Sequence, residues 1–501
     1  MNTFKQKSLY AALAGLGALG ATGAEAVSVN QNGLGQVLIY PYYTVRTVPT
    51  GIAGTDAAYN SLLSVVNSTG SAKAVKVRFL EGKNSREVLD FNLYLSAKDV
   101  WTTAIIPTTD GAGIFTADKS CTIPKVSSSS ASPTTFVNFA FTGSNDDKGG
   151  TSLDRTREGY AEIIEMGDVN GSTAVTATHT SGVPACTEAL LIAPVAPANT
   201  VAGTGGLFGS MTLVNVLKGE DFGVDPTALD GFSTTPLWFD AGDIRPTLAF
   251  VNPKTSVVVS GFNVYVTPNW PTLAPGNPVD PVSAVLMHNH VYNEFVLDVS
   301  TKSGTDWVVT FPTKREYVFA GSGVAQKLFE NNFTASGSCD TVVLTQFDRE
   351  ERTIVSQGTF SPPPPTLTDS LCWEANVISY VYPASSATPA QSTVLGSKNF
   401  STVKTDFVNG WVDLAFPLVG TRHQLVGPGS TVFNTALGTV APATTTTSFN
   451  GLPVIGFAAI TFENGQLSLG PGLLQSNYGG NFNHKTTTSI APTGTAPAGA
   501  Q

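Results

Sequence analysis

The stretch AVKVRFLEGKNSREVLDFNLYL, residues 74–95, decides the fold class. Apolar residues occupy every second position from Val75 to Phe79 and again from Leu89 to Leu95, and a polar, glycine-containing segment separates the two runs. Alternation on both sides of a turn is typical of an antiparallel β-hairpin, because successive side chains of a strand point to opposite faces. We therefore predict an antiparallel hairpin over these residues.

Similar patterns recur along the chain, most of them separated by turn-forming residues. They lie at residues 136–141, 160–166, 247–251, 257–266, 292–299, 307–311, 341–346 and 453–462. Stretches with convincing helical periodicity are few, and the best are residues 324–331 and 187–193. We therefore expect an all-β protein of two or three antiparallel, immunoglobulin-like β-sandwich units, with long loops and few short helices.

Shifts in composition suggest where these units meet. A serine run at 127–130, a proline- and glycine-rich stretch at 194–206 and four prolines at 362–365 interrupt the strand patterns. We predict β-sandwich units at 27–204 and 205–361 and a β-rich C-terminal region at 362–501. Each interruption could equally be a surface loop within one unit.

The first 26 residues have the pattern of a secretion signal. A basic start precedes an apolar stretch at residues 9–19 that is too short to span a bilayer, and Ala24-Glu25-Ala26 fits the small-x-small cleavage pattern. We expect cleavage between Ala26 and Val27, and an exported chain that is extracellular or on the outer cell surface, with no transmembrane span. The alternative is an N-terminal membrane anchor that stays in place.

The composition argues against one class of partner. Charged residues make up 13% of the chain, against about 25% in typical soluble proteins. The predicted signal holds Lys5, Lys7 and Glu25, so the mature chain would carry 25 basic and 36 acidic residues. We expect no binding to nucleic acid, since its phosphates require a basic face. Divalent cations or a polycationic partner remain compatible with this charge.

Four cysteines, Cys121, Cys186, Cys339 and Cys372, are an even number in a chain expected to be exported. Disulfides are favoured in that setting, and four cysteines allow three connectivities. We predict the pairs Cys121–Cys186 and Cys339–Cys372, because each then stays within one half of the chain. The alternative is buried free thiols.

Two polar loops could bind calcium. Asp146, Asp147 and Asp154 lie in a glycine-rich loop, and Asp168 and Asn170 precede a glycine. Carboxylate and amide oxygens on such loops are the hard ligands that Ca²⁺ prefers. The alternative for both loops is ordinary turns stabilised by aspartate and asparagine side chains.

A transition metal is a second possibility. His288, His290 and Glu294 form H-x-H-x-x-x-E, in which two imidazoles and a carboxylate could bind such an ion. The pattern resembles the first metal motif of the cupins, but the flanking glycines of that motif are missing, and neither His423 nor His484 lies in a recognisable second motif. The alternative is a histidine pair that makes local hydrogen bonds.

Catalytic patterns are otherwise missing from the sequence. Glu162 and Glu165 lie three apart in a predicted strand and should point to opposite faces, which does not suit a cooperating glycosidase pair. There is no G-x-S-x-G elbow, Walker loop or H-E-x-x-H motif. We therefore expect a non-catalytic protein.

Aromatic residues near the mature N-terminus suggest further roles. Tyr40, Tyr42 and Tyr43, and separately Trp373, could stack on a glycan. The apolar segment at residues 36–45 could also pair with the sheet edge of a neighbouring subunit. Alternatively, it is the first strand of its own unit.

Five segments resemble those of uncharacterised exported proteins of Gram-negative bacteria, some of them surface-layer-like. They are KAVKVRFLEGKNS (73–85), LDRTREGY (153–160), WVVTFPTKR (307–315), LCWEAN (371–376) and NYGGNFNHK (477–485). The resemblance spans most of the mature chain. It implies a structural role at the cell surface and carries over no active-site residue.

Three functions follow as hypotheses. The leading one is a self-assembling subunit of a surface coat or filament, and hence a homo-oligomer. The alternative is a secreted adhesin that binds a glycan or a cell-envelope polymer. The third is a secreted metal-dependent enzyme centred on His288, His290 and Glu294.

Overall fold

The computed structural model describes residues 26–49, 56–192, 200–260, 264–271, 276–319, 328–355, 369–434, 439–469 and 472–493. Strands dominate these residues, as predicted, and most of them pair antiparallel. The four described α-helices are short: α2 (Gly171–Ala177), α3 (Glu188–Leu191), α4 (Asp280–Val285) and α5 (Arg315–Val318). None of the described helices has the length and apolar character needed to cross a membrane.

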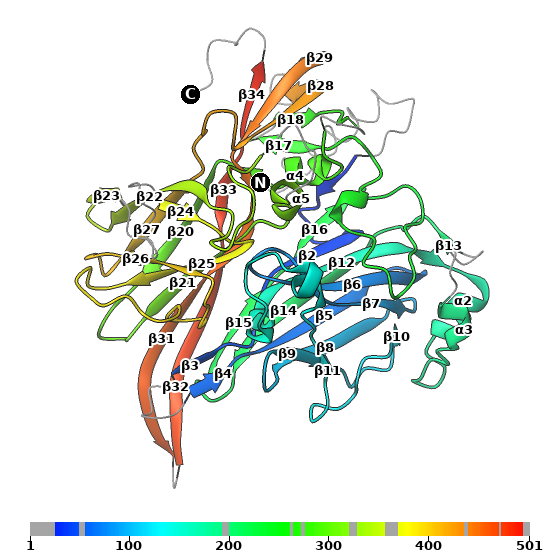
Figure 1. Ribbon diagram of the computed structural model, residues 1–501, viewed down its shortest axis with the longest axis horizontal. Coiled ribbons are helices and arrows are strands. Elements are labelled where there is room, and N and C mark those ends of the chain that lie inside the picture. Colours follow the sequence, from blue (N-terminus) through cyan, green and yellow to red (C-terminus); the bar gives the residue numbers. More distant parts are fainter. Residues whose placement is uncertain are drawn as a thin grey trace, which may run out of the picture.

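The first sandwich packs an eight-stranded sheet on a six-stranded sheet (Figure 1). The larger sheet has the order β1 (Ser28–Val29), β16 (Thr227–Asp230), β2 (Val37–Thr44), β12 (Glu158–Val169), β6 (Ala72–Glu81), β7 (Glu87–Leu95) and β10 (Cys121–Ile123), with β13 (Thr200–Val201) beside β12. The smaller sheet has the order β11 (Thr134–Thr135), β9 (Ala112–Phe115), β8 (Val100–Pro107), β5 (Asn60–Asn67), β14 (Leu207–Asn215) and β15 (Glu220–Val224). Side chains such as Val77 and Trp101 meet between the two sheets.

The hairpin predicted from residues 74–95 belongs to the larger sheet of this sandwich, between β12 and β10. β6 pairs antiparallel with β7, and Val77 lies opposite Phe91. Val75, Val77, Phe91 and Leu93 all belong to the buried core, so the apolar positions face inward as the alternation requires.

The second sandwich packs a six-stranded sheet on a five-stranded sheet. The first of these has the order β23 (Thr353–Val355), β22 (Asp340–Asp348), β27 (Asn409–Ala415), β20 (His290–Val296) and β33 (Lys485–Thr487), with β24 (Asp369–Leu371) also beside β22. The second has the order β26 (Phe400–Lys404), β25 (Ala375–Val381), β21 (Gly304–Thr310), β31 (Ile455–Leu469) and β32 (Gly472–Asn483). Phe295 stacks on Tyr380 between the two sheets, with ring centroids 5.4 Å apart.

The five-stranded sheet joins the two sandwiches because both of its faces are buried. Trp307 and Tyr380 belong to the core of the second sandwich, whereas Val308, Val377 and Phe457 belong to the core of the first. A sheet covered on both faces needs apolar residues at successive positions, which explains the unbroken apolar run in β21. The two sandwiches therefore share a continuous interior.

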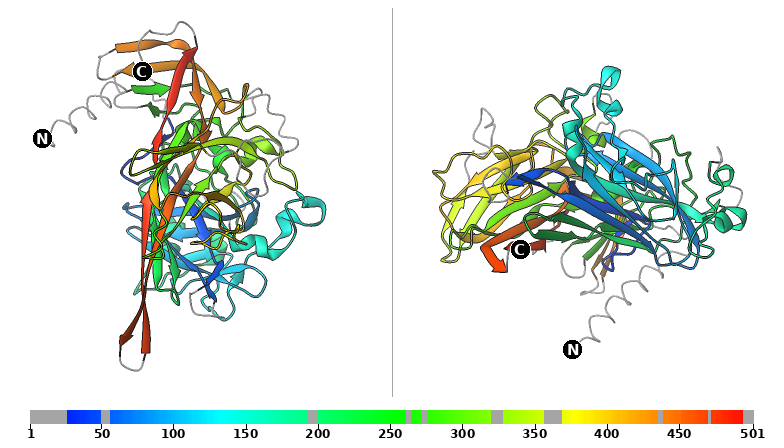
Figure 2. Two further views of the ribbon diagram at one scale, coloured as in Figure 1. Left: turned by 90° about the vertical axis from the view of Figure 1, so that its left-hand side faces the viewer. Right: turned by 90° about the horizontal axis from the view of Figure 1, so that it is seen from below.

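Two parts extend beyond the sandwiches (Figures 1 and 2). At one end, β17 (Val258–Ser260), β18 (Val264–Thr267), β28 (Gln424–Asn434), β29 (Thr439–Asn450) and β34 (Ser489–Thr493) form a further sheet. At the other end, the hairpin of β31 and β32 projects past the body of the molecule. The remaining strands form two small ribbons: β3 (Thr47–Pro49) with β4 (Asp56–Ala58), and β19 (Met287–His288) with β30 (Leu452–Pro453).

Some predicted elements differ from the structure. Residues 139–141 and 248–250 form short 3₁₀ helices instead of strands, since Phe141 N–H bonds back to Asn138 O and Phe250 N–H to Thr247 O. The single strand expected at 257–266 is the pair β17 and β18. Helix α3 confirms a helix within 187–193. Of the helix expected at 324–331, residues 324–327 lie outside the described residues, and the rest is not helical.

The predicted limits of the units do not coincide with the sheets. β14 pairs with β5 and β16 with β2, so both sheets of the first sandwich continue past residue 204. β32 and β33, which follow residue 362, complete sheets that begin in the preceding region. The strand orders do not confirm an immunoglobulin-like topology.

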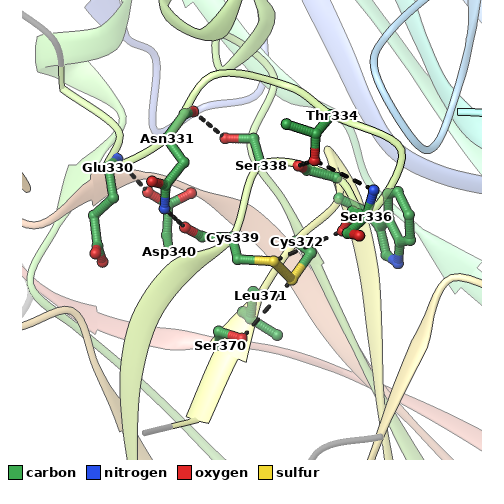
Figure 3. The surroundings of a disulfide bond; sticks show 12 residues. Glu330, Asn331, Thr334, Ser336, Ser338, Cys339, Asp340, Ser370, Leu371 and Cys372 are labelled. Atoms are coloured by element: carbon green, nitrogen blue, oxygen red, sulfur yellow. Dashed lines mark hydrogen bonds between the residues drawn. A yellow bond between two sulfur atoms is a disulfide. The ribbon is translucent and has the colours of Figure 1, made fainter. Parts of the chain in front are cut away.

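The predicted disulfides are confirmed. Cys121 bonds to Cys186 and Cys339 to Cys372, and no cysteine is free. Cys339 immediately precedes β22 and Cys372 immediately follows β24, and these strands pair with Asp340 opposite Leu371 (Figure 3). The second disulfide therefore holds together two neighbouring strand ends.

Candidate binding surfaces

The first predicted calcium loop is occupied by ion pairs. Asp147 accepts hydrogen bonds from both terminal nitrogens of Arg155, at 2.8 and 2.7 Å, and another from Asn84. Burial would raise the pKa of Asp147, but Arg155 and Asn84 hold it well below its usual range. Asp146 pairs with the exposed Lys148 at 2.8 Å.

The other predicted calcium ligands also have cationic or local partners. Asp154 pairs with Arg46 at 2.7 Å, and Asp168 pairs with the buried Lys73 at 2.7 Å. Asn170 precedes α2 without capping it through its side chain. The structure does not bring the five residues together.

The three residues of the H-x-H-x-x-x-E pattern are separated as well. His288 lies in β19 and lines a cavity of about 320 Å³ between the two sandwiches. His290 lies on the outward face of β20, where its Nδ1 is 2.7 Å from Asp413. Glu294 is exposed farther along the same face. The pattern therefore does not form one site.

The cavity between the sandwiches contains two neutral histidines. His484 Nε2 donates to Val308 O at 2.9 Å, and its Nδ1 accepts from Asn293 at 3.0 Å, which uses both ring nitrogens. Burial lowers the pKa of His288 and of His484 to about 4. In the described part of the chain, neither belongs to a cluster of three metal-binding groups. His484 therefore has a structural role at this junction.

The tyrosines proposed for glycan stacking do not reach the surface, and Trp373 is only partly exposed. Tyr40, Tyr42 and Tyr43 are completely buried in β2, which pairs with β16 on one side and β12 on the other. Trp373 is partly covered by Lys83, which lies over its ring. β16 pairs only with residues 37–39, but every residue of β2 is buried, so these tyrosines cannot contact a ligand.

The outward face of four strands of the six-stranded sheet is the first surface that the structure exposes, and it is bordered by Asp221 on the edge strand β15. Leu62 of β5, Val100 of β8 and Phe208 of β14 are 45, 46 and 41% exposed. The outward residues of β9, β8, β5 and β14, all fully described, are Gly113, Phe115, Val100, Thr102, Ala104, Ile106, Asn60, Leu62, Ser64, Val66, Phe208, Ser210, Thr212 and Val214. None of these residues is charged. We call this surface the uncharged face.

The register orders these side chains into rows. Val66 lies between Val100 and Phe208, and in the next row Ser64 lies between Thr102 and Ser210. Ser64 and Ser210 hydrogen-bond to each other at 3.1 Å through their hydroxyl groups. The result is a surface of apolar and hydroxyl side chains, with Phe115 and Phe208 as its largest members.

The second exposed surface is a groove of about 490 Å³ beside the outward face of β20 and β27. Trp411 and Phe482 are 41 and 46% exposed, and Phe347 stacks on Trp411 with centroids 4.1 Å apart. The complete lining is Tyr292, Asn293, Glu294, Trp411, Asn481, Phe482, Asn483 and Lys485. We call this the aromatic groove.

The comparisons with known proteins yield no family. No protein-family model matches the chain, no curated protein matches its sequence, and no solved structure matches its fold.

Sequence reasoning missed both surfaces. Trp411 and Glu294 lie opposite each other on β27 and β20, although 117 positions separate them. The alternation in residues 60–66 and 100–106 could have identified outward positions, but not that the two strands are neighbours. Cross-strand register was the missing information.

Proposed function

We propose that this chain is a non-catalytic structural protein of the cell surface that assembles with copies of itself through the uncharged face. The absence of charge from that face carries the proposal. The whole chain has a net charge of −10, so two copies repel each other where acidic surfaces meet. They can approach at the uncharged face without desolvating an ion.

The chemistry of the face supports this choice of partner. The cores of protein interfaces are depleted in charged residues, and contiguous exposed apolar patches mark interaction sites. Leu62, Val100 and Phe208 supply apolar area, while the serines and threonines can exchange hydrogen bonds with the same residues of a second copy. An identical patch on both copies suits a two-fold interface.

The surface location rests on other observations. The pattern of residues 1–26 is that of a secretion signal, and both disulfides are compatible with an oxidising compartment.

Light scattering of the chain lacking residues 1–26, over a concentration series, tests the assembly. Particles larger than a monomer that grow with concentration are expected. A monomer at every concentration would contradict the proposal.

Glycan binding is the second candidate function, and the aromatic groove favours it. Sugar rings present apolar C–H faces and hydroxyl edges. The exposed rings of Trp411 and Phe482 offer stacking surfaces, and Glu294 and Lys485 offer acceptors and donors beside them. Saturable binding to a neutral polysaccharide by a chain that stays monomeric would favour glycan binding over assembly through the uncharged face.

A further inference from the structure

A buried cluster near the end of the second sandwich is separate from both surfaces. Glu330 lies in the segment before β22, Asp340 is the first residue of β22, and His423 immediately precedes β28. One potential ligand atom from each lies within 4.8 Å of the other two. The side chains of Asp340 and His423 are 0% exposed, and that of Glu330 is 16% exposed.

The imidazole of His423 presents a lone pair to this cluster. Its Nδ1 is 2.7 Å from Pro417 O, an atom that can only accept, so Nδ1 carries the hydrogen. In the neutral ring, Nε2 then has no hydrogen. Nε2 is 3.4 Å from Asp340 Oδ1 and 3.4 Å from Glu330 Oε1. His423 Nε2, Asp340 Oδ1 and Glu330 Oε1 therefore bring three lone pairs close together in the interior.

The spacing fits a bound metal ion better than a hydrogen bond. A hydrogen bond between a protonated imidazole and a carboxylate spans about 2.7–2.9 Å. Zinc bonds to nitrogen and oxygen are about 2.0–2.2 Å, which places two tetrahedral ligands about 3.4 Å apart. The distances from His423 Nε2 to Asp340 Oδ1 and to Glu330 Oε1 are both 3.4 Å, which equals this separation between two ligands.

Each ligand atom is held by a second contact, as metal ligands commonly are. Asp340 Oδ1 accepts from Glu330 N–H at 2.8 Å, a contact drawn in Figure 3, and Glu330 Oε1 accepts from Thr341 N–H at 2.5 Å. His423 Nδ1 is fixed by Pro417 O. The disulfide at Cys339 further anchors the strand end that carries Asp340.

The charges leave room for a cation. The ammonium of Lys314 is 2.7 Å from Asp340 Oδ2 and balances one carboxylate. A neutral His423, which lies beside the second carboxylate, that of Glu330, would supply no positive charge to balance it, and an unbalanced buried charge is costly. A proton on His423 Nε2 or a metal ion between the three ligands would balance it.

We propose that Glu330, Asp340 and His423 bind one zinc ion, with a water or the second oxygen of Glu330 in the fourth position. The imidazole ligand disfavours calcium and magnesium, which prefer oxygen alone. Enclosure by His423 and Asp340 makes this a structural site that is filled as the chain folds. It shares no residue with the predicted calcium loops or with His288 and His290.

The test is metal content of the untagged chain, stripped with chelator, refolded with zinc and dialysed. We expect one zinc per chain and a higher melting temperature than in the metal-free protein. His423→Ala should abolish zinc binding, whereas the control His290→Ala should retain it. Because His423→Ala could fail to fold, Glu330→Gln, at a partly exposed position, serves as a second variant and should weaken binding at least tenfold.

X-ray absorption at the zinc edge requires no variant. A first shell of one imidazole nitrogen with oxygens supports the proposal. A wild-type chain that binds less than a tenth of an equivalent, or an NMR spectrum of the zinc-treated protein in which both nitrogens of His423 carry protons, would overturn it. Zinc retained by both His423→Ala and Glu330→Gln would overturn it equally.

Discussion

The hydroxyl of Ser397, which lies between β25 and β26, donates a hydrogen bond to the buried carboxylate of Glu158 at the start of β12. Glu158 also accepts from Arg46 Nε at 3.0 Å and from the hydroxyl of Tyr42 at 2.9 Å. The same carboxylate accepts from the backbone N–H of Lys398 at 3.0 Å. One buried anion thus links the two sandwiches.

Replacing this anion should destabilise the whole molecule. Glu158→Gln leaves the buried Arg46 without its main partner, and breaking a buried pair in this way costs about 3 kcal/mol. Asp154→Asn, which removes the 40% exposed partner of the same arginine, should cost much less. Urea unfolding of both variants measures the difference. Equal, small losses would contradict the role of Glu158.

Glu374 should make stability depend on pH. It is completely buried, and burial raises its pKa to about 8, only partly offset by Lys314 and Ser85. A raised pKa means that the folded state binds the proton more tightly. Stability from this group is therefore complete below its unfolded pKa, near 4.5, and is lost as pH rises through about 8.

The isosteric variant Glu374→Gln isolates this effect. The wild type should lose on the order of 3 kcal/mol more than the variant between about pH 5 and about pH 8. Urea midpoints at the two pH values provide the measurement. Parallel pH profiles for the two proteins would show that Glu374 is ionised in the folded state.

The disulfides should contribute substantially to stability. Cys121–Cys186 closes a longer loop than Cys339–Cys372, with sequence separations of 65 and 33. Replacing both cysteines of the first pair by serine should cost about 4 kcal/mol, and slightly less for the second pair. Denaturant unfolding of both variants tests whether loss of the first disulfide costs more stability than loss of the second. Peptide mapping without reductant should recover these two linkages and neither alternative connectivity.

Local patterns sufficed for part of the fold. The alternation in residues 74–95 predicts β6 and β7 because Val75, Val77 and Phe79 on β6 face the same core as Phe91 and Leu93 on β7. The alternation at residues 136–141 misleads: Phe136 and Phe141 are buried and Phe139 is exposed, but the backbone turns into a 3₁₀ helix. Side-chain burial and backbone hydrogen bonding can thus follow different patterns.

Contacts between residues that are far apart in the chain could not be predicted from the sequence. His423 lies 83 positions after Asp340, and its proximity to Asp340 and Glu330 depends on strand order, so spacing along the chain gives no sign of their cluster. The same limit applies to Tyr40, whose aromatic character suggests a ligand platform. Every residue of its strand is buried, with β12 along one edge and β16 along residues 37–39 of the other.

The glycan hypothesis predicts a specific loss in the aromatic groove. Trp411→Ala removes the largest exposed ring and should weaken binding of a neutral polysaccharide roughly threefold to tenfold, given about 0.5–1.5 kcal/mol for such a stacking contact. Phe139→Ala removes a 74% exposed ring outside the groove and should leave affinity unchanged. Isothermal titration calorimetry of both variants with a neutral polysaccharide measures the two affinities. Equal affinities would exclude the groove.

Assembly through the uncharged face is the central claim, and charge placed on that face tests it. Leu62→Lys combined with Phe208→Lys introduces two ammonium groups that an interface would have to desolvate. The change also makes the net charge less negative, so a loss of association could not be attributed to greater overall repulsion. Val175→Lys provides a matched control at a 72% exposed position on α2, away from the face.

Sedimentation velocity of the three proteins at matched concentrations is the most direct measurement. We expect the wild type and Val175→Lys to sediment as assemblies and the double variant to sediment as a folded monomer. A double variant that assembles as the wild type does, or a wild type that remains monomeric, would contradict assembly through the uncharged face.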